Sequence, residues 1–227
     1  MADLARGDLD APVPTCPDWT LRDLIEHTGF VHRWQAAAGR APGTDFPDPA
    51  TWRIPPAEGE SWADWFQTGV DDAGRDLSGI DASAPRWSWF GPDQTAGWYF
   101  RRIAQETLVH RIDAELSADA LTDVDPVFAA DGVEEMCDVF LPSATGQPIG
   151  GSGESLHLHA TDTEGEWTLT MHADHVDVAR GHAKGDAAIR GAARDLLLQV
   201  WGRNPVGDVE LFGDESVVAR FRAAAKI

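Results

Sequence analysis

The chain has 227 residues, a formal net charge of −20 at pH 7 and two cysteines. The negative charge argues against nucleic acid as a partner, and no apolar run approaches the ~20 residues of a membrane span. The acidic start, Met1 to Asp10, lacks the basic and apolar regions of a secretory signal, and two cysteines fit a reducing compartment, so we expect a cytoplasmic protein.

Helical patterns fill the first half of the chain. Met1 to Leu9 predicts a partial helix, and the capping-box variant Thr20-Leu-Arg-Asp23 begins a helix that runs to Gly39. Two further helices are predicted over Ser61 to Leu77 and Thr95 to about Ala118, after proline-containing loops. Eight of the ten tryptophans precede residue 100, which predicts an aromatic core or pocket wall in this half.

The second half has a mixed pattern. A connecting helix is predicted over Val127 to Leu141, and alternating residues predict three strands over Ser155 to Thr161, Trp167 to Met171 and Val176 to Val178. Amphipathic patterns predict helices over Asp186 to Trp201 and Ser216 to Ala225. The sequence thus predicts a helical domain over 1–125, a connecting helix and linker over 126–150, and a small α+β domain over 151–227.

Three residues suggest a metal site. His27 lies on the predicted core face of the first long helix, and Glu106 and His110 are four residues apart, on one side of a later helix. Two histidines and a carboxylate around an open position form a known arrangement for zinc. Without a metal, His27 could be a core histidine that is hydrogen-bonded to a carbonyl or carboxylate. Glu106 and His110 could be an ordinary i,i+4 pair on a helix surface. Both interpretations stay open.

Neighbouring residues have two interpretations as well. Asp113 could orient His110 as a hydrogen-bond acceptor, or it could pair with Arg102 or Arg111 on the surface. His32 lies about 140° around the helix from His27 and is expected on the surface or the rim of the site.

Further candidates lie outside this group. His157 and His159 point the same way on a predicted strand and could form another metal site with His172 or His175, or simply a solvent-facing polar face.

Arg203 could bind a substrate carboxylate, or serve as a cation at a helix C-terminus. Cys16 could be a nucleophile, although no histidine is close to it in the sequence.

Two motifs carry a family resemblance. The segment Pro14-Thr-Cys-Pro-Asp-Trp-Thr-Leu-Arg-Asp-Leu-Ile-Glu-His27, followed by Gly29-Phe-Val-His-Arg-Trp34, resembles the opening signature of the mycothiol-dependent maleylpyruvate isomerase family of actinobacteria. Arg101-Arg-Ile-Ala-Gln-Glu-Thr-Leu-Val-His-Arg-Ile-Asp-Ala-Glu115 is similar to its second signature. Later similarities follow in the family's order over 132–142, 155–162, 165–167 and 196–203, so the resemblance spans almost the whole chain.

The resemblance implies a DinB-like four-helix bundle followed by a small sterol-carrier-like α+β domain. It also implies a divalent metal, usually zinc, held by a histidine of the second helix and a Glu-x-x-x-His pair of the fourth. By motif position these ligands are His27, Glu106 and His110, and the family's assisting arginine corresponds to Arg203.

One departure concerns the start of the bundle. Relatives have a longer segment before the first signature, which forms a complete first helix. Only Met1 to Leu9 is available here. The resemblance therefore implies a stunted first helix, or cover from a partner subunit.

The implied activity is a zinc- and mycothiol-dependent reaction. The enzyme would activate a thiolate for addition to an electrophilic small molecule, as a cis–trans isomerase or an S-transferase. A metal-dependent hydrolase and a non-catalytic small-ligand-binding module on the same fold are the alternatives. The sequence identifies no electrophile, and we expect a monomer or a homodimer.

Overall fold

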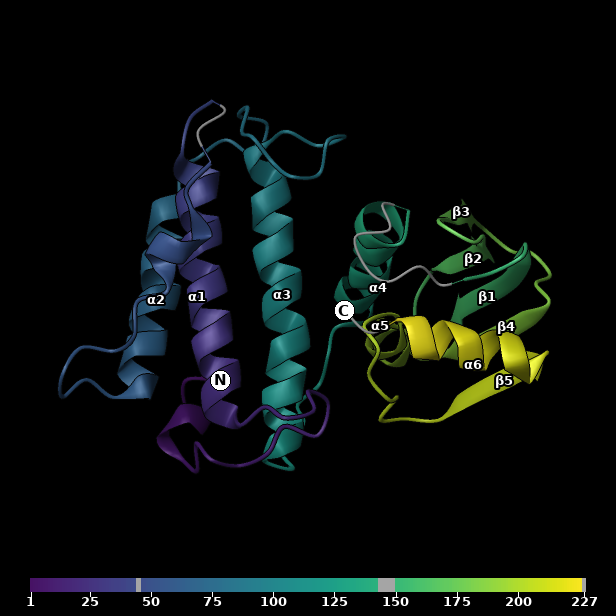
Figure 1. Ribbon diagram of the computed structural model, residues 1–227, viewed down its shortest axis with the longest axis horizontal. Helices are drawn as coiled ribbons and strands as arrows, with labels where there is room; N and C mark the ends of the chain where they lie inside the picture. Colours follow the sequence, from purple (N-terminus) through teal and green to yellow (C-terminus); the bar gives the residue numbers. More distant parts are fainter. Residues whose placement is uncertain (44–45, 143–149, 226–227) are drawn as a thin grey trace. The chain divides into compact units, whose positions relative to one another are not determined.

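The computed structural model describes residues 1–43, 46–142 and 150–225 (Figure 1). The chain forms two compact units, Met1–Thr122 and Asp123–Ile227. The predicted connecting helix belongs to the second unit, and residues 143–149 of the predicted linker lie outside the described residues.

The first unit contains three long helices, α1 (Leu21–Arg40), α2 (Trp62–Leu77) and α3 (Ala96–Ser117). Helix α1 lies between the other two and packs against both (Figure 1). The segment before α1 forms only a 3-10 turn, η1 (Leu4–Arg6), which ends at Gly7. Among the described residues the predicted four-helix bundle is therefore a three-helix arrangement.

Side-chain caps set the starts of two of these helices. The Thr20 hydroxyl accepts from the Asp23 amide, and the Asp23 carboxylate accepts from the Thr20 amide at 2.8 Å, which confirms the capping box. Ser61 caps α2 by accepting from the Asp64 amide at 3.1 Å. Another 3-10 turn, η2 (Pro49–Trp52), lies in the loop between α1 and α2.

The contact between α1 and α2 requires a glycine. A Cβ atom at Gly29 would lie 2.4 Å from Cζ3 of Trp65, so a larger residue would push the helices apart. Arg33 places its guanidinium 3.9 Å from the centroid of a Trp65 ring and donates to the Trp65 carbonyl. Trp65 and Trp98 are buried, which confirms the predicted aromatic core.

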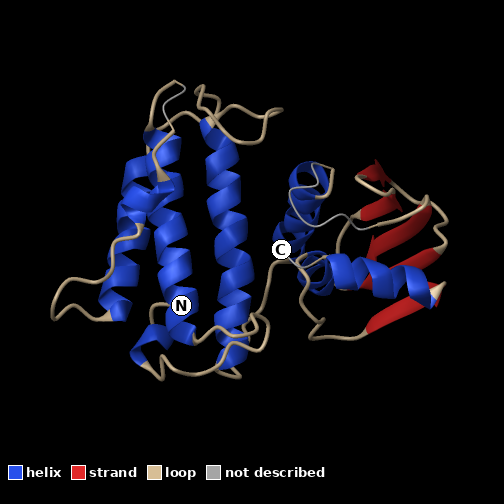
Figure 2. Cartoon of the chain, viewed as in Figure 1, coloured by secondary structure: helices blue, strands red, loops and turns tan. Residues whose placement is uncertain are grey.

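The second unit begins with α4 (Pro126–Glu135), which continues as a π-helical turn, η3 (Met136–Phe140). The strands of the described residues all lie in this unit (Figure 2): β1 (Glu154–Ala160), β2 (Glu166–Met171), β3 (Val176–Arg180), β4 (Ala187–Gly191) and β5 (Val209–Gly213). The sheet order is β3-β2-β1-β4-β5. Strands β1 and β4 are parallel, and the other neighbours are antiparallel. This α+β architecture was predicted.

The predicted helix over Asp186 to Trp201 is wrong in its first part. Residues Ala187–Gly191 form β4, and the helix α5 covers only Ala193–Val200. The strand β5 was not predicted at all, whereas the terminal helix α6 (Glu215–Ala224) was. Strand β4 forms because it fills the position beside β1, a pairing that local helix periodicity does not reveal.

The two faces of the sheet differ in character. Leu156, Leu158 and Ile189 are fully buried on the face against which α5 and α6 pack. His157 and His159 belong to the opposite face, because the side chains of successive residues in a strand point to alternate faces. No helix in the described ranges combines the length and apolar character that crossing a membrane requires.

Candidate metal site

Helices α1 and α3 bring the three predicted ligands together. Nε2 of His27 lies 3.1 Å from Oε1 of Glu106, and Nε2 of His110 lies 3.2 Å from the same oxygen. The three ligand atoms lie within 4.8 Å of one another. Two imidazole nitrogens and one carboxylate oxygen, converging at this distance, fit a divalent ion such as zinc.

Buried partners orient both residues of the α3 pair. Arg102 donates to Oε2 of Glu106 at 2.8 Å, which leaves Oε1 facing the histidines. Nδ1 of His110 lies 2.9 Å from Oδ2 of Asp113, a fully buried carboxylate. Arg111 instead pairs with Glu115 at 3.6 Å. Asp113 thus contacts His110 from within the core, as its orienting role requires.

Without a metal ion, Glu106 and His110 form a buried ion pair in which each residue shifts the pKa of the other. Burial raises the pKa of Glu106, but hydrogen bonds from His110 and His27 and the charge of Arg102 outweigh it and hold the pKa well below its usual value. Burial lowers the pKa of His110, but its contacts with Asp113 and Glu106 outweigh that effect and raise the pKa to about 9. Metal binding here must therefore displace a proton from His110.

The loop before α1 contributes a wall that sequence reasoning missed. The Trp19 ring lies 5.1 Å from the His27 ring and stacks against His110 at 6.4 Å between centroids. Trp19 belongs to the first signature, and that was the only signal for it. The Cys16 thiol donates to Asp113 at 3.6 Å. The fold thus supplies the histidine that the sequence did not place near Cys16, because Cys16, His110 and Asp113 offer ligand atoms within 4.8 Å of one another.

His32 does not lie on the surface or rim as predicted. It is 2% exposed, because α1 is covered on more than one side. Its Nε2 contacts the Thr107 hydroxyl at 2.7 Å, and its Nδ1 has no hydrogen-bond partner among the described residues. Burial is the main cause that lowers the pKa of His32 to about 4, against the attraction of Glu106.

Replacing His32 should therefore change the acid stability of the protein. Between pH 6.5 and 4 the unfolded chain binds a proton here that the folded chain excludes, so stability falls as the pH drops. Between pH 7.5 and 4.5, the free energy of unfolding should fall by about 2 kcal/mol less in His32→Gln than in the wild-type protein. Urea unfolding followed by tryptophan fluorescence measures this, with His175→Gln as an exposed control. Equal pH dependence in wild type and His32→Gln would contradict it.

The remaining predicted site residues all belong to the second unit. Arg203 follows α5 and donates to the Trp201 carbonyl at 2.6 Å, so its role toward a substrate stays a prediction. His172 and His175 gather with Asp177 and do not join His157 and His159.

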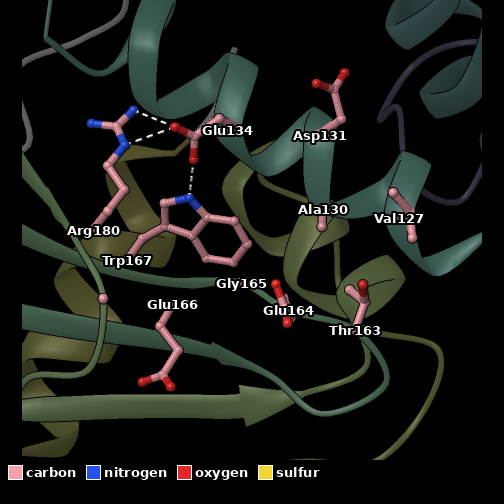
Figure 3. A pocket seen from close by; sticks show the side chains of 11 residues that line it. Val127, Ala130, Asp131, Glu134, Thr163, Glu164, Gly165, Glu166, Trp167 and Arg180 are labelled. Atoms are coloured by element: carbon pink, nitrogen blue, oxygen red, sulfur yellow. Dashed lines mark hydrogen bonds and ion pairs between the residues drawn. The ribbon is translucent and has the colours of Figure 1, made fainter.

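An open pocket of about 420 Å³ also lies in the second unit. Figure 3 shows Glu134 of α4 accepting from Trp167 and Arg180 beside it. None of the predicted ligands lines this pocket, and neither does Arg203.

Comparison with known proteins identifies the family. The model of the mycothiol maleylpyruvate isomerase N-terminal domain matches residues 1–115, and the model of the family's C-terminal domain matches residues 128–220. No curated protein matches the chain significantly. A solved structure titled UbiJ-SCP2 ubiquinone synthesis protein is 22% identical, with 46% of this chain and 93% of that chain covered and a TM-score of 0.29. The two family models together cover most of the chain, which therefore belongs to the mycothiol maleylpyruvate isomerase family.

Proposed function

We propose that this protein is a metal-dependent enzyme that uses the thiol mycothiol to attack an electrophilic small molecule, as a cis–trans isomerase or an S-transferase. Family membership implies a mycothiol-dependent function of the isomerase type. The observation that carries the metal dependence is the convergence of His27, Glu106 and His110 within 4.8 Å.

Three protein ligands would leave a position open for the thiol. A divalent ion such as zinc, when bound, supplies positive charge that lowers the pKa of a coordinated thiol and holds the sulfur in place. The thiol would add to an activated double bond; rotation and loss of the thiol would then complete an isomerisation. Retention of the new carbon–sulfur bond would make the reaction a transfer.

The surrounding side chains have separable roles in this proposal. Arg102 and Asp113 fix the orientations of Glu106 and His110, so the ligand atoms need little reorganisation. Trp19 covers the two imidazole rings and limits the access of water from that side. Arg203 is proposed to hold a carboxylate of the substrate, as a planar guanidinium can bind both carboxylate oxygens.

The test is turnover of maleylpyruvate by the full chain, with and without mycothiol, and before and after metal removal by a chelator. We expect turnover only when zinc and mycothiol are both present. If mycothiol is required but not consumed, the reaction is an isomerisation. If one mycothiol is consumed for each molecule of another electrophile, the reaction is a transfer. Activity with zinc alone would instead favour hydrolysis, and activity that survives metal removal would reject the metal-dependent mechanism.

A further inference from the structure

A second histidine cluster lies on the sheet of the second unit. Its members are His157 and His159 of β1, Glu166 of β2, and His182, which follows β3. We propose that these four residues form a second divalent-metal site, for which zinc is the best-fitting ion. This proposal is independent of the proposed function, since none of the four residues belongs to the site on α1 and α3.

Strand geometry explains why these residues meet. His157 and His159 are two apart on β1 and share a face, and Glu166 is the direct cross-strand partner of His159. The Gly181 amide donates to the Glu166 carbonyl at 3.0 Å, and Gly181 has a φ of +93° that favours glycine. The chain therefore turns directly after β3 and places His182 beside Glu166.

The cluster lies on the face of the sheet opposite Trp167. Trp167 points toward α4, where its indole donates to Glu134. In Figure 3 the Glu166 side chain extends away from Trp167, as expected for consecutive strand residues. The cluster therefore lies on the opposite face from Leu158, the direct cross-strand partner of Trp167.

The contacts converge on a single oxygen atom. Oε2 of Glu166 lies 2.9 Å from Nε2 of His157, 2.7 Å from Nδ1 of His182 and 3.6 Å from Nδ1 of His159. Glu166 accepts hydrogen bonds from His157 and His182, whereas His159, at 3.6 Å, lies beyond hydrogen-bonding distance of this oxygen. A divalent cation, by contrast, can bind all three nitrogens and the carboxylate at once.

The distances suit a tetrahedral ion after a small contraction. Ligands of a tetrahedral zinc lie about 3.3 Å from one another, and these ligand atoms lie within 4.8 Å. The His182 side chain is 80% exposed and that of Glu166 is 25% exposed, so both have room to adjust. His157 is buried, and its Nδ1 contacts the Thr168 hydroxyl at 3.1 Å, which orients Nε2 toward Glu166.

The number of ligands predicts a structural role. Four protein ligands complete a tetrahedral shell and leave no position for a substrate, unlike the three on α1 and α3. An ion bound here would link the segment after β3, which contains His182, to strands β1 and β2. It would therefore stabilise the second unit without taking part in turnover.

The cluster of His172, His175 and Asp177 provides a matched comparison. Its two rings stack at 4.4 Å between centroids, and the side chains of His175 and Asp177 are 47% and 71% exposed. None of its three members is buried as His157 is. His175→Ala therefore removes an imidazole from the same unit without touching the proposed site.

The experiment measures metal binding by the full-length protein. After metal removal, zinc is titrated by calorimetry, and cobalt(II) is titrated with detection of its visible absorption. His110→Ala is used as the background, because it disables the α1–α3 site, and His182→Ala or His175→Ala is added to it. We expect tetrahedral cobalt bands and one zinc per chain in the background and with His175→Ala.

His182→Ala should weaken that zinc affinity at least about 100-fold, since second-sphere changes alone cost 10–100-fold. His159→Ala, at a second and partly exposed ligand, should do the same. Zinc should raise the thermal midpoint of the background protein but not of the His182→Ala variant. Unchanged zinc binding in His182→Ala and His159→Ala, or an equal loss in His175→Ala, would overturn the proposal. In the otherwise wild-type chain His182→Ala should also remove one zinc, a result that holds even if the α1–α3 site binds none.

Discussion

His27→Ala and His110→Ala are each expected to remove one bound zinc ion per chain and to lower turnover at least about 100-fold. Each substitution deletes one of only three protein ligands, and altered ligand orientation alone typically costs 10–100-fold in metal affinity or activity. The two residues come from different helices, α1 and α3, so equal effects would show that one ion joins both.

The measurements are elemental analysis of the purified variants and turnover with saturating zinc and mycothiol. His175→Ala serves as the control, because it removes an exposed imidazole that lies outside both proposed sites. Far-ultraviolet circular dichroism checks that the variants fold. A folded His110→Ala variant that keeps wild-type turnover would contradict the assignment.

Glu106→Gln should reduce both metal binding and stability. The substitution keeps the shape of the side chain but removes the charge that faces Arg102, whose side chain is 3% exposed. Breaking a buried ion pair from one side is strongly destabilising. We therefore expect a loss of about 3 kcal/mol in the free energy of unfolding, measured in the presence of a chelator.

Glu26→Gln is the matched control for this change. Glu26 directly precedes His27 on α1 and is exposed, so its replacement should alter stability by less than about 0.5 kcal/mol. The chelator separates the loss of the ion pair from the loss of bound metal. If Glu106→Gln were as stable as Glu26→Gln under these conditions, the Arg102–Glu106 pair would have no structural role.

Helix periodicity predicted the long helices and made His27, Glu106 and His110 candidates, and the family resemblance then selected them as ligands. The i,i+4 spacing of Glu106 and His110 holds on any helix, and Leu24 and Val31 placed His27 on the core side. His32 was misplaced because the pattern was read as one buried face. Helix α1 instead packs between α2 and α3, so a residue far around the helix from His27 is also buried.

Features that depend on non-local contacts were missed. Trp19 and Cys16 lie in a loop, and only the fold brings them beside His110 and Asp113. Strand β4 has the sequence Ala-Ala-Ile-Arg-Gly, which carries a weak local signal, and its partner β1 lies about thirty residues earlier. His182 follows a strand end, so no periodicity associates it with His157.

The central claim is that His27, Glu106 and His110 bind one ion together. The most direct measurement is anomalous diffraction at the zinc absorption edge from crystals of the zinc-loaded protein. We predict a peak about 2.0–2.2 Å from Nε2 of His27, Nε2 of His110 and a carboxylate oxygen of Glu106. Zinc-loaded crystals with no anomalous peak between these three side chains would contradict the claim.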